Sequence, residues 1–344
     1  MFDTKIIFND RDQKVYEDEL RDWLPDKIFD AHVHLFSGSC FQDNYVLPPK
    51  SSYWKFGGEI TIEQYNHINS ILLPEQKIST LCFGHPDIHT NIPRADSYVG
   101  SICDNKQIFG MTLLSPKTSI EEVKKCVLEN KFIGYKPYRN FVDWMDYEDV
   151  TINDMLTKEQ MELADEMGLA VTLHIPKAKR LADPCNQKQM VEICRDYPNA
   201  KIIFAHIGRA YYMQNVVGFL DGIADCENAY LDLAMVSHPG VIEYTFKHFP
   251  KDKILFGSDA PIAYLRGKSV EINNQYAYLL GEDYQIGNSI YDPNHTVEFT
   301  TFMYEELRGI KEACIKSNLE HEEIENIFYN NAFKLFSSIV EKNY

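Results

Sequence analysis

The 344-residue sequence lacks several features that mark common protein classes. No apolar run approaches the ~20 residues needed to span a bilayer. The N-terminus, MFDTKIIFNDRDQKVYEDEL, does not show the basic and then apolar pattern of a secretory signal peptide. The eight cysteines form no C-x-x-C pair, which disfavours a zinc ribbon or a thioredoxin-like site. We therefore expect a cytoplasmic protein with free thiols and no membrane partner.

Positive charge is also scarce in this chain. Lys and Arg number 34 against 51 Asp and Glu, which gives a formal net charge of −17. Such an acidic surface repels phosphate backbones, so we expect a small-molecule substrate and no nucleic-acid partner. A local basic pocket can still lie inside an acidic shell, and the sequence leaves open whether the protein is a homo-oligomer.

Eight short apolar segments recur along the chain, and most are followed by a helical pattern. Their nearly continuous apolarity is typical of strands buried on both faces of a parallel sheet. Helices are predicted over 119–130, 158–167 and 187–197, with Gly168 in the position of a C-terminal cap. The predicted strands cover residues 27–35, 78–84, 108–114, 132–137, 169–175, 201–207, 229–235 and 253–259.

Alternation of eight strands with helices predicts a (β/α)₈ TIM barrel, with a doubly wound sheet as the alternative. No G-x-G-x-x-G motif follows the first strand and no Walker-type loop occurs, which weakens the alternative. We expect residues 1–26 to form an N-terminal extension packed on a barrel domain of residues 27–344. Two long segments, 36–58 after strand 1 and 262–294 after strand 8, are expected to be insertion loops that cover the active-site end.

Residues able to bind a metal stand at the carboxyl ends of four predicted strands. His32 and His34 end strand 1, and residues two apart on a strand point the same way. His174, His206 and Asp259 end strands 5, 6 and 8. A single buried histidine is usually hydrogen-bonded to the backbone, but this repeated placement indicates a divalent metal site at one rim of the barrel.

In the segments FDAHVH, GYKPY, LHIP, FAHIGR, LFGSDAP and IFYNNAFKLF the chain resembles the amidohydrolase superfamily, and most closely its amidohydrolase-2 branch of metal-dependent hydrolases and decarboxylases. The resemblance implies that His32, His34, His174 and Asp259 are metal ligands. It also implies that Asp259 is the catalytic base and that His206 is an acid/base group or a further ligand. One divalent ion is expected, zinc by default, with manganese or iron as alternatives.

Lys136 bears on the number of metal ions. In binuclear members of the superfamily a carbamylated lysine on this strand bridges two metals, so a second ion held by Lys136 and His206 is an alternative. We favour one ion, with Lys136 as a cation for a substrate carboxylate or an oxyanion. Arg139 and Arg209 follow Lys136 and His206 by three residues and are predicted to bind an anionic substrate.

The implied activity is that of a metal-dependent hydrolase, in which metal-activated water attacks an amide, lactone or ester of a small, anionic substrate. The alternative is non-oxidative decarboxylation of an aromatic or unsaturated carboxylic acid, which would use the same metal ligands. A non-catalytic metal-binding barrel is disfavoured by the presence of Asp259. Asp232 is expected to orient a ligand histidine or to pair with a neighbouring strand, and His85 and His89 are interpreted as structural more than as substrate contacts.

Overall fold

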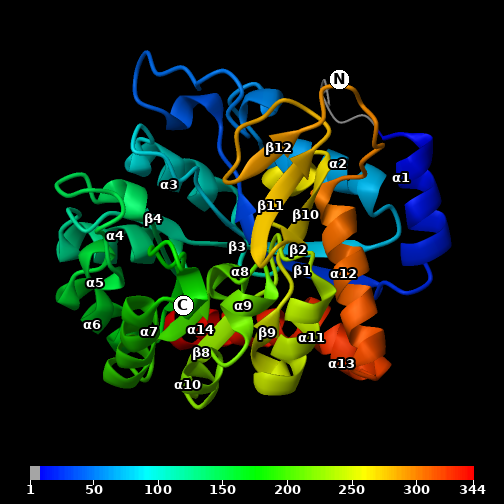
Figure 1. The fold of residues 1–344 in the computed structure, drawn as a ribbon. Helices are drawn as coiled ribbons and strands as arrows, with labels where there is room; N and C mark the ends of the chain where they lie inside the picture. The colour runs from blue at the N-terminus through cyan, green and yellow to red at the C-terminus, as the bar shows by residue number, and fades with distance from the viewer. Residues whose placement is uncertain (1–7) are drawn as a thin grey trace.

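The computed structural model describes residues 8–344, and parallel strands form its centre (Figure 1). All eight predicted strands are present, and the third is divided at Met111 into two short pieces, β3 and β4. One sheet contains β1 (Lys27–His34), β2 (Lys77–Phe83) and β3 (Ile108–Gly110). The second contains β4 (Thr112–Leu114), β5 (Gly134–Pro137), β6 (Ala170–Leu173), β7 (Lys201–Phe204), β8 (Ala229–Asp232) and β9 (Ile254–Leu255).

Backbone hydrogen bonds join the two sheets at both junctions. The N–H of Ile133 donates to the carbonyl of Gly110 at 2.9 Å, which connects β5 to β3. On the other side, the N–H of His34 donates to the carbonyl of Ala260 at 2.8 Å, which connects β1 to the segment after β9. The parallel strands therefore follow one another in a ring, as expected of a barrel, and not as an open doubly wound sheet.

Helices surround the strands (Figure 1), and several begin at strong capping signals. Thr61, Ser119 and Thr157 each form a capping box with the residue three positions later. Gly168 adopts a φ of +67° after α6 (Lys158–Met167), in the left-handed conformation expected at a C-terminal cap. The helices between the strands are α2 (Ile62–Leu72), α3 (Ile92–Ile102), α4 (Ile120–Asn130), α5 (Ile152–Met155), α6 (Lys158–Met167), α7 (Pro184–Asp196), α8 (Ala205–Arg209), α9 (Met213–Val216), α10 (Asp221–Ala224) and α11 (Pro239–His248).

The chain after β9 has more regular structure than the predicted loop. Residues Gly267–Ile272 (β10) and Gln275–Leu280 (β11) form an antiparallel hairpin, and Ser289–Tyr291 (β12) pairs with β11. The hairpin forms because every second residue of β11 is buried, beginning with Tyr276 and Tyr278. In Figure 1 this small sheet lies at the same end of the molecule as residues 36–58. That both segments are insertions stays a prediction.

The two ends of the chain pack on the ring. The C-terminal tail is helical, and in it Phe336 packs on Phe29 of β1 with ring centroids 5.3 Å apart. Near the N-terminus, Asp12 pairs with Arg266 at the start of the hairpin. Residues 1–7 of the predicted N-terminal extension lie outside the described residues. The terminal helices are α1 (Asp10–Val15), α12 (Phe302–Lys316), α13 (His321–Glu325) and α14 (Asn331–Asn343).

No helix within residues 8–344 combines the length and the apolarity needed to cross a membrane. All eight cysteines are free, in agreement with the sequence analysis.

Candidate metal centre

His32 and His34 lie at the carboxyl end of β1, and both side chains are buried. Nδ1 of His34 lies 2.8 Å from the carbonyl oxygen of Gly84. Because a carbonyl only accepts, Nδ1 must donate, which leaves Nε2 as the nitrogen that can offer a lone pair. This Nε2 is 3.4 Å from Oδ1 of Asp259, so the two groups share one small space.

Asp232 stands behind His32 and fixes its orientation, which is the first of the two roles expected from the sequence. Its Oδ2 lies 2.9 Å from Nδ1 of His32, and its Oδ1 accepts the backbone N–H of His206 at 2.7 Å. The contact to Nδ1 leaves Nε2 of His32 directed toward Asp259, at 3.4 Å from Oδ1. Nε2 has no hydrogen-bond partner among the described residues. A buried imidazole nitrogen backed by a carboxylate is the usual setting of a metal-ligating histidine.

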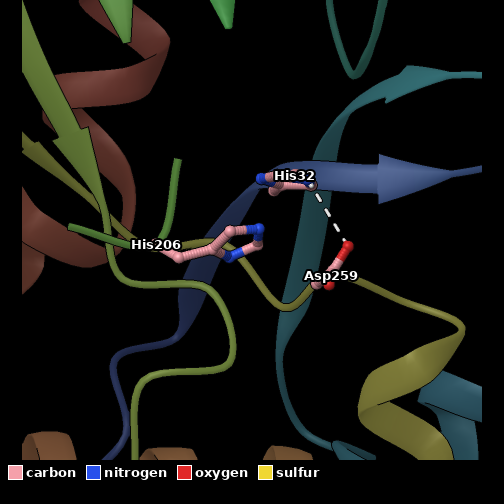
Figure 2. A group of neighbouring side chains, drawn as sticks. All are labelled: His32, His206 and Asp259. Atoms are coloured by element: carbon pink, nitrogen blue, oxygen red, sulfur yellow. Dashed lines mark ion pairs between the residues drawn. The ribbon is translucent and has the colours of Figure 1, made fainter. Parts of the chain in front are cut away.

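His206 and Asp259 complete a compact group with His32. Their ligand atoms all lie within 4.8 Å of one another, and Figure 2 shows the three side chains gathered from β1, α8 and the turn after β9. His206 and Asp259 have φ angles of +57° and +63°, which is the left-handed region. For residues other than glycine this conformation costs of order 1–3 kcal/mol, and such strain occurs most often at functional sites.

The electrostatics of the group favour a bound cation. Burial lowers the pKa of His32 well below its usual value and also lowers the pKa of His206, so both imidazoles are neutral and offer lone pairs. Burial alone would raise the pKa of Asp259, but its hydrogen-bonding contact with His34, and the charges that His32 and His206 carry when they are protonated, bring it below the ordinary value. Neutral imidazoles beside a carboxylate are donors that zinc, manganese and iron accept.

His174 lies at the edge of this group. Its ring is 5.4 Å from that of His206 in an edge-on arrangement, and it stacks on Tyr138 at 5.4 Å. From the sequence, His174 was expected to be a metal ligand, and His206 an acid/base group or a further ligand. In the structure it is His206 that lies with His32 and Asp259 in the compact group, whereas His174 contacts that group through its ring.

Lys136 is fully buried at the same end of the ring. Its Nζ lies 5.0 Å from the ring centroids of Phe83 and Tyr138 and has no hydrogen-bond partner in the described part of the chain. Burial lowers its pKa to about 8, although Asp232 and Asp259 pull in the opposite direction. An ammonium held in this way is available to an anionic group that enters the site.

The two predicted arginines converge on one carbonyl oxygen. Nη1 of Arg139 and Nη1 of Arg209 donate to the carbonyl of Pro176 at 2.8 and 3.1 Å. Nε of each has no hydrogen-bond partner within residues 8–344. The structure therefore brings these two guanidinium groups together, as an anion site requires.

A third arginine was missed by the sequence analysis. Cζ of Arg180 lies 3.9 Å from the ring centroid of Tyr276 and 5.3 Å from that of Tyr211. The ring of Tyr211 is in turn 6.2 Å from that of His206. Arg180 lies well beyond the end of β6, with a φ of +58°, so strand-end spacing gave no signal for it.

A ring of parallel strands with buried histidines and an aspartate at their carboxyl ends defines a metal-dependent barrel enzyme. A family model described as Amidohydrolase (Amidohydro_2) matches residues 29–337, and the chain belongs to this amidohydrolase-2 family, as the sequence motifs predicted. No curated protein matches the sequence.

Several solved structures share the fold. Amidohydrolase 2 from Bifidobacterium longum subsp. infantis is 14% identical with a TM-score of 0.54, over 91% of this chain and 99% of that chain. A probable 2-pyrone-4,6-dicarboxylic acid hydrolase from Acinetobacter baumannii is 12% identical with a TM-score of 0.53, over 90% and 98%. A dihydroxybenzoic acid decarboxylase from Polaromonas sp. JS666, with bound manganese and the inhibitor 2-nitroresorcinol, is 13% identical with a TM-score of 0.54, over 91% and 97%. At these identities the similarity concerns the fold.

Proposed function

We propose that the protein is a metal-dependent hydrolase that cleaves an amide, lactone or other ester bond in a small anionic substrate. The observation that carries this proposal is the buried group of His32, His206 and Asp259, whose ligand atoms lie within 4.8 Å of one another. We assign one divalent ion to this group, zinc by the preference of imidazole and carboxylate ligands, with manganese or iron as alternatives. His34 and His174, at the edge of the group, complete the proposed set of ligands.

A bound divalent ion would supply Lewis acidity, which lowers the pKa of water to ~7 and polarises a carbonyl group. The carboxylate of Asp259 then accepts the proton of the attacking water and delivers it to the leaving group. Lys136 faces the oxygen of the scissile carbonyl and stabilises the negative charge that develops there. The ammonium of Lys136 suits this role better than bridging a second ion, so we propose a single ion.

Arg209 and Arg139 are proposed to bind the anionic group of the substrate. Their Nη1 atoms share the carbonyl of Pro176, which leaves the remaining N–H groups for a carboxylate. Arg180 adds a third positive charge beside Tyr211 and Tyr276. The substrate is thus drawn into a local positive region inside an acidic protein.

The second candidate is a metal-dependent non-oxidative decarboxylase of an aromatic or unsaturated carboxylic acid. The stacked rings of His174 and Tyr138 favour it, because flat side chains at the site suit a flat substrate. A decarboxylase of related fold binds manganese and an aromatic inhibitor. In this case the arginines hold the carboxylate and an acid of the site protonates the ring carbon.

The experiment is a parallel screen of the metal-loaded protein. Lactones and esters of small carboxylic acids are followed by proton release, amides by release of ammonia or amine, and hydroxybenzoates by release of carbon dioxide. Release of protons, ammonia or amine without carbon dioxide supports the hydrolase, and carbon dioxide release supports the decarboxylase. His32→Ala should lose the bound metal and the turnover together, whereas His321→Ala, on an exposed residue of α13, should lose neither. Full metal content in His32→Ala would contradict the proposed centre.

A further inference from the structure

His85, two residues after β2, is a buried histidine without a role in the proposed chemistry. His85 is only 4% exposed, and neither ring nitrogen has a hydrogen-bond partner in the described residues. The backbone around it is well ordered by hydrogen bonds, because its carbonyl accepts from the N–H of Asp87 at 3.0 Å and from Thr90 Oγ1 at 2.8 Å. A buried imidazole with two unused nitrogens is unfavourable in the chain alone.

The surroundings of the ring are aromatic. Phe36, Phe41 and Tyr53 lie edge-on to the His85 ring, with centroids 4.9, 5.3 and 4.2 Å away. Burial lowers the pKa of His85 to about 3, so the imidazole is neutral and can donate from one nitrogen and accept at the other. This setting suits a neutral polar group such as a hydroxyl or a carbonyl, because a charged group would lose its hydration without gaining an ionic partner.

His85 lies beside the metal centre. It directly follows Gly84, whose carbonyl is 2.8 Å from Nδ1 of His34. In the order of the strands, β2 stands across the ring from β7, which leads into Arg209. A substrate that spans the metal centre would therefore meet positive charge at one end and a neutral imidazole at the other.

We propose that His85 is a further substrate-binding residue, which forms a hydrogen bond to a hydroxyl or carbonyl group at the end of the substrate opposite its anionic group. The inference rests on the proposed function of the neighbouring metal centre. It narrows the substrate to an acid that carries a neutral polar group at the end remote from its anionic group. It also differs from the interpretation of His85 as a structural residue, since a structural histidine would have partners within the folded chain.

The test uses two probes that differ in one hydroxyl, 4-hydroxybenzoate and benzoate. Their affinities for the metal-loaded protein are measured by calorimetry. We expect wild type to bind 4-hydroxybenzoate about tenfold more tightly than benzoate, as one buried hydrogen bond allows. His85→Phe should abolish this preference and leave benzoate binding unchanged, and His85→Gln should retain part of it. His89→Phe, on an exposed histidine of the same loop, should keep the full preference.

Melting of the ligand-free protein supplies a second readout. Because neither nitrogen is bonded within the described chain, His85→Phe should melt at the wild-type temperature or above it. A hydroxyl preference that is absent from wild type, or that persists in His85→Phe, overturns the proposal. So does a large fall in the melting temperature of His85→Phe without a change in preference. Neither measurement requires turnover, so failure of the substrate screen would not be confused with failure of this inference.

Discussion

The carboxylate of Asp232, at the end of β8, lies 2.9 Å from Nδ1 of His32 on β1. The same carboxylate holds the backbone of His206 and Ala234 through their N–H groups, at 2.7 and 3.2 Å. One buried side chain therefore sets both the tautomer of one candidate ligand and the position of another. The candidate metal centre therefore depends on a residue outside the group of His32, His206 and Asp259.

We expect Asp232→Asn to weaken metal affinity by about 10- to 100-fold, which is the usual effect of replacing a residue that hydrogen-bonds to a metal ligand. An amide can still accept a hydrogen bond, but it lacks the charge that raises the basicity of His32. The affinity is measured by competition with a chromogenic chelator. Asp225→Asn, on an exposed aspartate before the same strand, serves as the matched control. Equal affinity in Asp232→Asn and wild type would contradict the supporting role.

Asp259 carries the proposed proton transfer, and Asp259→Asn should lower turnover by about 10²- to 10⁴-fold, the usual contribution of a general base. The fold should be retained, because the backbone N–H of Asp259, which is unchanged by the substitution, donates to the carbonyl of His32 at 2.9 Å. Turnover is followed on the substrate that the screen identifies, with circular dichroism as the check on folding. Asp292→Asn, in the exposed segment after β12, is the control. Wild-type turnover in Asp259→Asn would reject the assignment of the base.

Arg209 is predicted to bind the anionic end of the substrate, so Arg209→Gln should weaken binding of benzoate by about tenfold or more, as loss of a charged hydrogen bond does. The structural reason is that its Nη1 is held by the carbonyls of Ile175 and Pro176, at 2.9 and 3.1 Å, and the rest of the guanidinium remains available. Arg195→Gln, on the exposed face of α7, should bind benzoate as wild type does. Equal affinity for benzoate in wild type, Arg209→Gln and Arg195→Gln would show that Arg209 does not bind the anionic group.

The strand ends explain why most of the site could be predicted from the sequence. Parallel strands in a ring bring their carboxyl ends to one rim, so His32, His34 and Asp259 could be expected from the sequence alone to meet. Their distances confirm it, with both histidines 3.4 Å from Asp259. The same rule cannot tell whether His174 or His206 lies closer to His32 and Asp259. The left-handed backbone at His206 affects how far its ring enters the group.

The hairpin after β9 was predicted only as a loop, although a local signal was present. Asn273 and Asn274 both have positive φ, at +50° and +58°, which is typical of the two-residue turn that joins twisted strands. Alternation of buried tyrosines in β11 is the second signal. Arg180 could not be predicted in this way, because its place beside Tyr276 depends on this hairpin folding over the site.

A buried carboxyl group far from the metal centre gives a prediction for the pH dependence of stability. Asp96 of α3 lines a cavity of about 830 Å³ between α3 and α4. It accepts hydrogen bonds from Thr112 Oγ1 at 2.8 Å and from the thiol of Cys126 at 3.2 Å. Burial raises its pKa to about 7, although these hydrogen bonds act in the opposite direction. The native state therefore keeps Asp96 protonated at pH values where the unfolded chain has already lost the proton.

Because its pKa is higher in the native state, Asp96 contributes stability that is fully present below pH ~4 and lost as the pH rises through about 7. Asp96→Asn keeps a neutral polar group and removes the titration. Between pH 5 and 8 we expect the free energy of unfolding of wild type to fall relative to Asp96→Asn, by at most about 1.4 kcal/mol per pH unit. Urea unfolding at several pH values measures this difference. Asp104→Asn is the control, because burial would raise the pKa of Asp104 but the backbone N–H groups of residues 106–108 bring it below its ordinary value. Asp104 therefore does not titrate between pH 5 and 8. A difference between wild type and Asp96→Asn that does not change with pH would show that Asp96 is ionised in the native state throughout this range.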